Sequence, residues 1–441
     1  MDFCEFAVEK AMKLGMDEAD AVVQKEKTIS IGFSQEIQNI STLNKTMISL
    51  RVIKDKKIAT YTTTLLNEDS INEVVERAVK IAKVAPEDPN WSSLNKITKK
   101  TAVKNLYDPL IEKLDYNELT DAINSGLDNV VNDGRALITR GMLRIVKREF
   151  SFANCYCDAM ERKSSRFNTY LLAKAVKGGE ITGSEHIESR FWKDIDYLSL
   201  TNSAIEMSQK YLEAKPIESE KISVIIKNDV FSRIINRMLG SSISAEIVRK
   251  GRSPLKGKID TQVAQDCFTI TDDGSLDKGY NSSSFDQEGY PTQKTPIISK
   301  GVLQNYLYDH YSAAIDDTKS TGNANRAGRA KPRPMISNLI LANGDRDFDE
   351  VVSETKRGLL IESTIGEWLS NPTSGQLNAT VTHGQLIENG EYAQSVRNVI
   401  LSGNFWEAIK TNIEAICNDS RNSGNLYSPS VKFSELVVAG K

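Results

Sequence analysis

The chain has 441 residues, of which 39 % are hydrophobic and 26 % charged, and its formal net charge is −3. A nearly balanced charge gives no reason to expect a polyanion partner, because phosphate neutralisation needs clustered Lys and Arg in excess. No apolar run reaches the roughly 20 residues that span a bilayer, the acidic amino terminus is unlike a signal peptide, and five widely spread cysteines are typical of reduced thiols. We therefore expect a cytoplasmic protein with no membrane and no nucleic-acid partner.

The length predicts about three domains of roughly 150 residues each. In the first, apolar residues recur at helical spacing over 3–14 and stop at Gly15, which is typical of a capped amphipathic helix. Alternation of apolar and polar residues over 20–64 predicts a three-stranded meander, and an apolar stripe over 71–82 predicts a second helix. Residues 1–90 therefore form a predicted helix–β-meander–helix domain.

A predicted middle α/β domain covers residues 105–215. It follows a Pro- and Ser-containing segment, 85–104, that lacks periodicity and is expected to be a linker. Within the domain, helical stripes at 116–131 and 197–211 flank a long β-rich stretch over 136–175.

The third predicted domain covers residues 220–441. The short apolar run 222–226 predicts a buried strand, and a strong helical stripe follows it. We expect this helix to start at Asn228 or Asp229, which are good capping residues, and to end at Gly240.

Beyond residue 251 the chain alternates short β-rich runs with turn signals. Hairpin-type turns are predicted at 272–274, 300–301, 343–344 and 389–390. The carboxy-terminal domain is therefore expected to be a large, barrel-like, mainly antiparallel β domain, and the fold class is α+β.

Isolated residues do not define a reaction. Cys155 and Cys157 lack the spacing of a zinc or redox pair, and alternation would place them on one face of a strand as structural thiols. His186, His310 and His383 have no ligand partner at helical spacing and are expected to be structural or surface residues.

A local run of basic residues carries no interleaved aromatic residue, so a solvated loop is favoured over a nucleic-acid contact. The run consists of Lys319, Arg326, Arg329, Lys331 and Arg333.

Several motifs in fixed order resemble the TldD/PmbA family. The resemblance is carried by Phe285-Asp-Gln-Glu-Gly-Tyr-Pro-Thr292, Ile298-Ser-Lys-Gly-Val-Leu303, Tyr306-Leu-Tyr-Asp309 and Ser320-Thr-Gly-Asn323 with Arg326, and is extended by 386–390, 401–404 and 437–440. The family implies two related subunits that form a heterodimeric metallopeptidase acting on unfolded or flexible peptides. TldD carries His-Glu-x-x-x-His and binds zinc, whereas TldE, also called PmbA, lacks the motif.

When the sequence is aligned on Arg249-Lys-Gly251, the two motif histidines fall on Asn236 and Ser241 and the glutamate falls on Arg237. Asn and Ser are poor zinc ligands, and arginine cannot act as a base at neutral pH. The resemblance therefore implies a TldE/PmbA-type subunit with no catalytic residue and no metal of its own. Zinc is expected in a TldD-type partner.

Other members of the motifs are expected to bind substrate or to serve as scaffold. These candidates are Gly289, Pro291, Thr292, Thr321, Gly322, Asn323 and Arg326. A ligand role for Cys417, which aligns near a cysteine ligand only with a gap, or for His310 stays open. Strand edges at 300–301 and 389–390 are expected to pair with extended peptides, with 321–326 as a rim.

Three alternatives remain at this point. The chain could regulate DNA gyrase or a toxin–antitoxin system, or it could be an independent peptidase whose residues are not adjacent in sequence. In the absence of a partner, related subunits tend to reuse one interface, so a homodimer is a further alternative.

Overall fold

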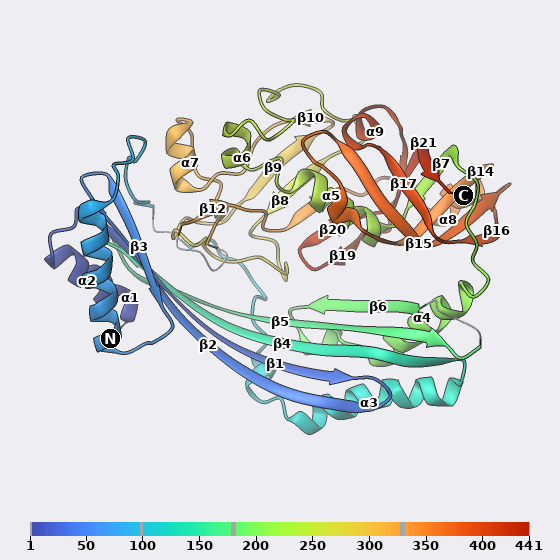
Figure 1. Ribbon diagram of the computed structural model, residues 1–441, viewed down its shortest axis with the longest axis horizontal. Helices are drawn as coiled ribbons and strands as arrows, with labels where there is room; N and C mark the ends of the chain where they lie inside the picture. The colour runs from blue at the N-terminus through green and yellow to red at the C-terminus, as the bar shows by residue number, and fades with distance from the viewer. Residues whose placement is uncertain (1, 98–99, 178–181, 327–330, 441) are drawn as a thin grey trace.

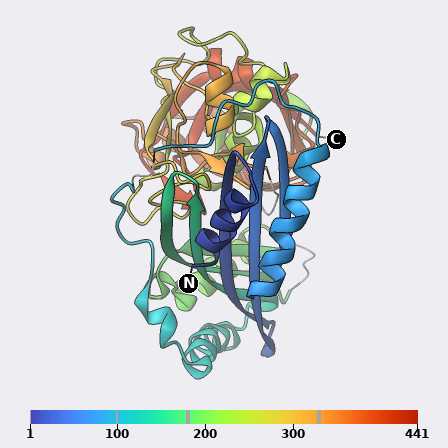
Figure 2. The same ribbon diagram turned by 90° about the vertical axis from the view of Figure 1, so that its left-hand side faces the viewer.

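The computed structural model describes residues 2–97, 100–177, 182–326 and 331–440. Its amino-terminal part is built on one long, curved, six-stranded antiparallel sheet with strand order β3-β2-β1-β4-β5-β6 (Figures 1 and 2). The strands are β1 (Glu18–Phe33), β2 (Ile37–Lys54), β3 (Lys57–Thr63), β4 (Ala136–Asn154), β5 (Cys157–Ala175) and β6 (Thr182–Ser189).

Alternation along these strands assigns each residue to one of two faces. On β1, Ala19, Ala21 and Val23 pack with the first two helices, and Ile29, Ile31 and Phe33 pack with the next two. The intervening residues, such as Asp20 and Val22, point to the opposite face. That face receives the carboxy-terminal domain, which lies in the hollow of the curved sheet (Figure 1).

Four helices cover the outer face of the sheet. They are α1 (Phe3–Lys13), α2 (Glu68–Val84), α3 (Tyr116–Asp133) and α4 (Tyr197–Lys210). Asp2, Asn67 and Asp196 cap α1, α2 and α4 by accepting backbone N–H bonds, and α3 ends at the left-handed Gly134. The predicted helices and meander are confirmed.

The first and middle predicted units contribute to the same sheet. β1 pairs with β4 without interruption, from Asp20 opposite Asn154 to Phe33 opposite Gly141. The described residues of the predicted linker 85–104 form no helix or strand. Trp91 and Leu94 from this segment are nevertheless buried against Ile53 of the sheet.

The carboxy-terminal domain contains a closed barrel. β14 pairs with β7, β7 with β21, β21 with β17, β17 with β15, and β15 returns to β14, while β16 and β18 pair outside this ring. Most pairs are antiparallel, as predicted, but β7 and β14 are parallel. The strands are β7 (Glu220–Ile226), β14 (Arg357–Ile365), β15 (Gln376–Glu388), β16 (Glu391–Val396), β17 (Val399–Asn404), β18 (Ile413–Ile416) and β21 (Val431–Ala439).

A second sheet, β10-β9-β8-β13-β20-β19, and short helices complete this domain. Its strands are β8 (Ile270–Asp273), β9 (Lys294–Ser299), β10 (Val302–Leu303), β13 (Leu339–Leu341), β19 (Arg421–Ser423) and β20 (Leu426–Ser428), and β11 (Ala324–Asn325) pairs with β12 (Arg333–Pro334). The helices are α5 (Asn228–Leu239), α6 (Ala245–Arg249), α7 (His310–Ile315), α8 (Phe348–Ser353) and α9 (Phe405–Thr411), with single 3₁₀ turns η1 (Pro109–Glu112), η2 (Trp192–Asp194) and η3 (Glu367–Leu369).

Two of the four predicted hairpin turns are confirmed. Lys300-Gly301 joins β9 to β10 and Asn389-Gly390 joins β15 to β16, and all four residues have positive φ, as type I′ turns require. The turn at 272–274 was predicted wrongly, because a long loop separates β8 from β9. The turn at 343–344 was also predicted wrongly, because it connects β13 to α8 and packs against Ile416.

Two further expectations are corrected. Cys155 is not on a strand face with Cys157, because Cys155 and Tyr156 form the turn between β4 and β5. The strand edge at β10 is not open, since Val302 bridges to Gln262 and Thr261 accepts from the Leu303 amide. Along β16, in contrast, residues 391–394 are exposed, and the Lys215 backbone pairs with the end of the strand, where its amide donates to the Ser395 carbonyl and its carbonyl accepts from the Arg397 amide.

Candidate functional site

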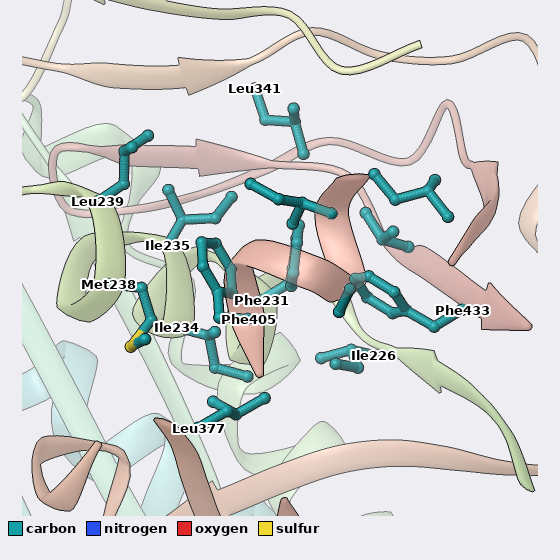
Figure 3. Close-up of a cluster of buried hydrophobic side chains, with 14 of the residues drawn as sticks. Ile226, Phe231, Ile234, Ile235, Met238, Leu239, Leu341, Leu377, Phe405 and Phe433 are labelled. Carbon is teal, nitrogen blue, oxygen red and sulfur yellow. The ribbon is translucent and has the colours of Figure 1, made fainter. Parts of the chain in front are cut away.

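Helix α5 carries the positions that align with the zinc motif. Its apolar side enters the core of the carboxy-terminal domain, where Phe231 stacks edge-on against Phe433 with ring centroids 5.7 Å apart (Figure 3). Ile234, Ile235, Met238 and Leu239 are buried beside it. Each such side chain contributes about 1.5–3 kcal/mol by leaving water, so this face fixes the helix.

The exposed side of α5 presents Asn236 and Arg237, and Ser241 follows the helix on the surface. The Nε of Arg237 donates to the Ser370 carbonyl at 2.9 Å, and its Nη2 donates to the same oxygen. One turn earlier, Arg233 pairs with Asp229 and Glu367. The position aligned with the catalytic glutamate therefore holds a cation fixed by main-chain hydrogen bonds.

The backbone around the motif differs from one expectation. Gly240 was expected to end the helix, and it does follow the last helical residue, Leu239, but its φ of −54° and ψ of −40° are right-handed helical and not the left-handed conformation common at such a glycine. Its amide donates to the Asn236 carbonyl, and the Ile243 amide donates to the Leu239 carbonyl. The chain thus keeps helical turns through this segment. The helix begins at Asn228, as predicted, but its cap position is Lys227 and no side chain caps it.

Cys417 does not join these positions. It is buried with Ile225 of β7 and Leu360 of β14, whereas α5 packs with Val224 and Ile226. Neighbouring residues on a strand face opposite sides, so the barrel wall separates Cys417 from α5. Burial raises the pKa of the Cys417 thiol to about 12, with a further contribution from Asp419.

The three histidines each have different neighbours. His186 of β6 lies 3.3 Å from the Ser423 hydroxyl and 3.5 Å from an Asp229 oxygen, where the curved sheet meets the carboxy-terminal domain. His310 starts α7, and His383 contacts Tyr211 edge-on. Among the residues that the structure describes, no group of three or more His, Cys, Asp or Glu could hold a metal ion. The donor set at 236–241 likewise does not fit zinc, which prefers imidazole, thiolate and carboxylate.

The motifs at 285–292 and 320–326 come together where the carboxy-terminal domain meets the curved sheet. At their centre, Arg51 of β2 pairs with Asp20 of β1 and, at 3.0 Å, with Glu288. Arg326 pairs with the same Asp20 at 2.9 Å. All four side chains are buried, so two cations and two carboxylates join sheet and domain without solvent.

Burial opposes the ionisation of Asp20, but the charges of Arg326 and Arg51 outweigh it and lower the pKa of this carboxyl below its ordinary value. The expectation that Arg326 belongs to a solvated basic loop is therefore wrong. Lys319, Lys331 and Arg333 are exposed, as expected, and Arg329 lies outside the described residues. The sequence does show the charged residues Asp20 and Arg51 within otherwise apolar strands. It does not show which charged residues pair with each other.

The remaining candidate residues allow the loops at 285–292 and 320–326 to pack closely. Gly322 has a φ of +72°, and a Cβ there would lie 2.5 Å from the Pro291 carbonyl oxygen. Gly289 has a φ of +74° and lies against Phe152 of β4. These two glycines permit backbone approaches that no other residue would allow.

The polar candidate residues Thr292, Thr321 and Asn323 are held in place by hydrogen bonds within the carboxy-terminal domain. The Thr292 hydroxyl donates to the Ser283 carbonyl, and the Thr321 hydroxyl donates to Asn323 Oδ1 at 2.6 Å. Asn323 in turn donates to the buried Asp272 at 2.7 Å. Thr292, Thr321 and Asn323 are buried, so the expected rim at 321–326 is an internal scaffold over its first four residues and at Arg326.

An exposed apolar group lies beside α5. Trp368 and Leu369 of η3 are 65 % and 67 % exposed, and Ile365 precedes them at 49 %. Arg237 anchors the next residue, Ser370, so this apolar group and the aligned motif positions form one continuous surface. We refer to Ile365, Trp368 and Leu369 as the η3 patch.

The fold and this surface define a class of protein: a barrel-containing domain held in the hollow of a long curved sheet. The model of the PmbA/TldA metallopeptidase C-terminal domain matches residues 219–440, and that of PmbA/TldA metallopeptidase domain 1 matches residues 19–82. The chain belongs to the PmbA/TldD family.

Relatives and solved structures agree with this assignment. An uncharacterized protein of Methanocaldococcus jannaschii is 28 % identical over 98 % of this chain and 99 % of its own, and the metalloprotease PmbA homolog of Haemophilus influenzae is 23 % identical over 99 % and 95 %. A Thermotoga maritima structure described as a modulator of a DNA gyrase superposes with a TM-score of 0.90 at 26 % identity, covering 99 % of both chains. TldE from Thermococcus kodakarensis gives 0.88 at 23 % identity over the whole of both chains, which supports the fold.

Within the described part of the chain, no helix is long and apolar enough to cross a bilayer.

Proposed function

We propose that this chain is a TldE/PmbA-type subunit that is catalytically silent alone and completes the substrate cavity of a TldD-type, zinc-bearing partner. The pair would hydrolyse unfolded or flexible peptides. The observation that supports the proposal is the exposed surface of α5 and the turn after it, which presents Asn236, Arg237 and Ser241. The resemblance aligns these three residues with two zinc ligands and a base. A guanidinium fixed at the position aligned with the base repels a divalent ion. Because it stays protonated, it also cannot accept a proton from a bound water.

The η3 patch supports association with a partner subunit. An exposed tryptophan and leucine are unusual on a monomer surface, and tryptophan is enriched at the centres of protein interfaces. Because related subunits tend to present the same surface to each other, the partner best suited to this patch is a TldD-type chain, or a second copy of this chain when the partner is absent.

The central experiment compares three samples: the chain alone, a TldD-type subunit from the same genome, and their mixture. We expect an unfolded test peptide to be cleaved by the mixture and not by this chain, with cleavage abolished by a chelator. Chelator-sensitive cleavage by the lone chain, in proportion to its concentration, would contradict the proposal.

A matched pair of variants tests the partner surface. Trp368→Ser should weaken association by at least about tenfold, since a buried interface tryptophan commonly contributes 2 kcal/mol or more. Leu65→Ser removes an apolar side chain that is 60 % exposed on the amino-terminal part, and it should leave association unchanged. Association can be measured by analytical ultracentrifugation of the labelled pair. Equal affinities for both variants would place the interface elsewhere.

A further inference from the structure

A cavity of about 300 Å³ lies between the curved sheet and the carboxy-terminal domain, apart from α5 and the η3 patch. One wall comes from β4 and β5, and the other from the loops at 281–287 and 322–325 and from 335–337. Even-numbered residues of these strands point into the hollow of the sheet, which places Arg148, Arg162 and Arg166 on this wall. Arg190, just after β6, completes the lining.

Three of the four arginines have no carboxylate partner among the residues that the structure describes. Arg148 pairs with Glu26 at 2.6 Å, but Arg162, Arg166 and Arg190 form no ion pair there. The Nε atoms of Arg162 and Arg166 are buried and meet no hydrogen-bond acceptor. Since native proteins satisfy nearly all buried polar atoms, two such atoms in one cavity indicate an absent acceptor.

The positions of these guanidinium groups are fixed. Arg162 lies over Phe150 and Phe285, with its central carbon 4.5 Å and 5.1 Å from the ring centroids. Arg166 lies over Tyr280 at 4.9 Å and donates to Asn281. These contacts orient the cations without neutralising them.

Arg190 is the most deeply buried of the group, at 2 % exposure. Its nitrogens donate to the carbonyls of Gly279 at 3.0 Å, Ser282 at 2.9 Å, and Leu106 and Ser165 at 3.2 and 3.3 Å. Four neutral acceptors satisfy its hydrogen bonds but leave its charge unbalanced. A buried charge of this kind is costly unless a counter-charge is supplied.

One carboxylate, that of Asp286, also lines the cavity, but its oxygens already accept hydrogen bonds from main-chain amides. Its oxygens accept from the amides of Glu288, Tyr290 and Ala324 at 2.8–3.0 Å. A single engaged carboxylate cannot balance three guanidinium groups, so the cavity retains an excess of positive charge.

We propose that this cavity binds an oxyanion, a carboxylate or phosphate group, held by Arg162, Arg166 and Arg190. Planar guanidinium forks match the paired oxygens of both groups. The limited volume suits a small anion or the end of a peptide and is too small for a polynucleotide. The inference does not depend on the proposed function, because this chain alone supplies the site.

The test is calorimetric titration of the full chain alone, at low salt, with three probes: inorganic phosphate, a short acetylated peptide with a free carboxylate, and the same peptide as its amide. We expect at least one of the two anionic probes to bind, and the amide not to bind. Binding of phosphate alone assigns the site to phosphate-bearing ligands, and binding of the carboxylate peptide assigns it to peptide ends. No binding of either anion by the wild type would overturn the proposal.

Arg162→Gln and Arg166→Gln should each weaken binding about tenfold or more, the usual loss for a hydrogen bond to a charged group. Arg140→Gln makes the same change of charge at an exposed position of β4 outside the cavity and should bind as the wild type does. Without ligand, both cavity variants should melt no lower than the wild type, because each removes a buried unbalanced charge. Unchanged affinity in both cavity variants would overturn the assignment.

Discussion

Arg51 of the curved sheet pairs with buried carboxylates on both sides of the junction with the carboxy-terminal domain. It donates to Asp20 and Glu288 and lies 5.4 Å from the ring centroid of Trp91. We expect Arg51→Met to lower the free energy of unfolding by about 3–5 kcal/mol, because the change removes the ion-pair partner of the buried Glu288 and one of the two that hold Asp20. Urea denaturation measures the loss.

The matched control is Arg357→Met. Arg357 pairs with Glu220 and Glu388 but is 50 % exposed, so its loss should cost no more than about 1 kcal/mol. A similar cost for both variants would mean that the buried network contributes no more than a surface ion pair.

The buried imidazole of His310 makes the free energy of unfolding depend on pH. Burial lowers the pKa of His310 below its ordinary value, although the nearby Glu288 charge opposes this shift. As the pH falls below about 6.5, the unfolded chain takes up a proton on this residue before the folded chain does, so the free energy of unfolding decreases. His310→Gln should flatten the decline between about pH 7 and about pH 5.5, as measured by urea denaturation across that window. Parallel profiles for variant and wild type would show that His310 does not contribute.

The loop elements at 285–292 and 320–326 depend on the close approach at Gly322. Gly322→Ala combines a left-handed backbone with a Cβ that would meet the Pro291 carbonyl, whereas Gly257 has a similar φ of +70° and open space. We expect Gly257→Ala to cost about 1–2 kcal/mol from backbone strain and Gly322→Ala about 1–3 kcal/mol more. Thermal unfolding compares them, and equal losses would show that the loop relaxes without cost.

Helix α5 allows a direct test of the aligned motif. In the triple variant Asn236→His, Arg237→Glu, Ser241→His, the two imidazoles would be five residues apart, roughly 140° around a helix of 3.6 residues per turn. Because the backbone at Gly240 is helical, we expect them to diverge and the variant to bind zinc weakly, without turnover. Elemental analysis after dialysis measures the metal. Stoichiometric zinc with peptide hydrolysis comparable to that of the natural pair would contradict this expectation.

Local patterns predicted the elements better than their partners. The apolar stripe of α5 and the alternation around Ile29 were sufficient to predict a helix and a strand. A face that is buried against a core requires apolar residues at the helical or strand repeat, and this repeat is visible in the sequence. The pairing of β1 with β4 left no such trace, since any two alternating strands are compatible. Likewise, Arg162 and Arg166 look like ordinary polar-face residues of a strand, and only the tertiary fold shows that this face is covered.

At the level of the whole molecule, the curved sheet and the carboxy-terminal domain should unfold together. Besides the ion pairs, Phe285 is inserted among Phe150, Phe152 and Met160 of the sheet. We expect one calorimetric transition for the wild type and two for Phe285→Ala, because removal of a buried phenylalanine costs about 3–5 kcal/mol at the junction. Two transitions in the wild type would show that the parts are independent.

The barrel has a consequence for synthesis. Its first strand, β7, is complete at Ile226, but β21, which lies between β7 and β17, is made only at Val431–Ala439. At about 5–20 residues per second, the ribosome takes at least about ten seconds to bridge that interval. Until then β7 and β17 present open edges, which are recognised by chaperones and prone to misassembly. A transcript cut short by even a few codons in this region would yield a chain whose barrel cannot close, so degradation should remove incomplete copies.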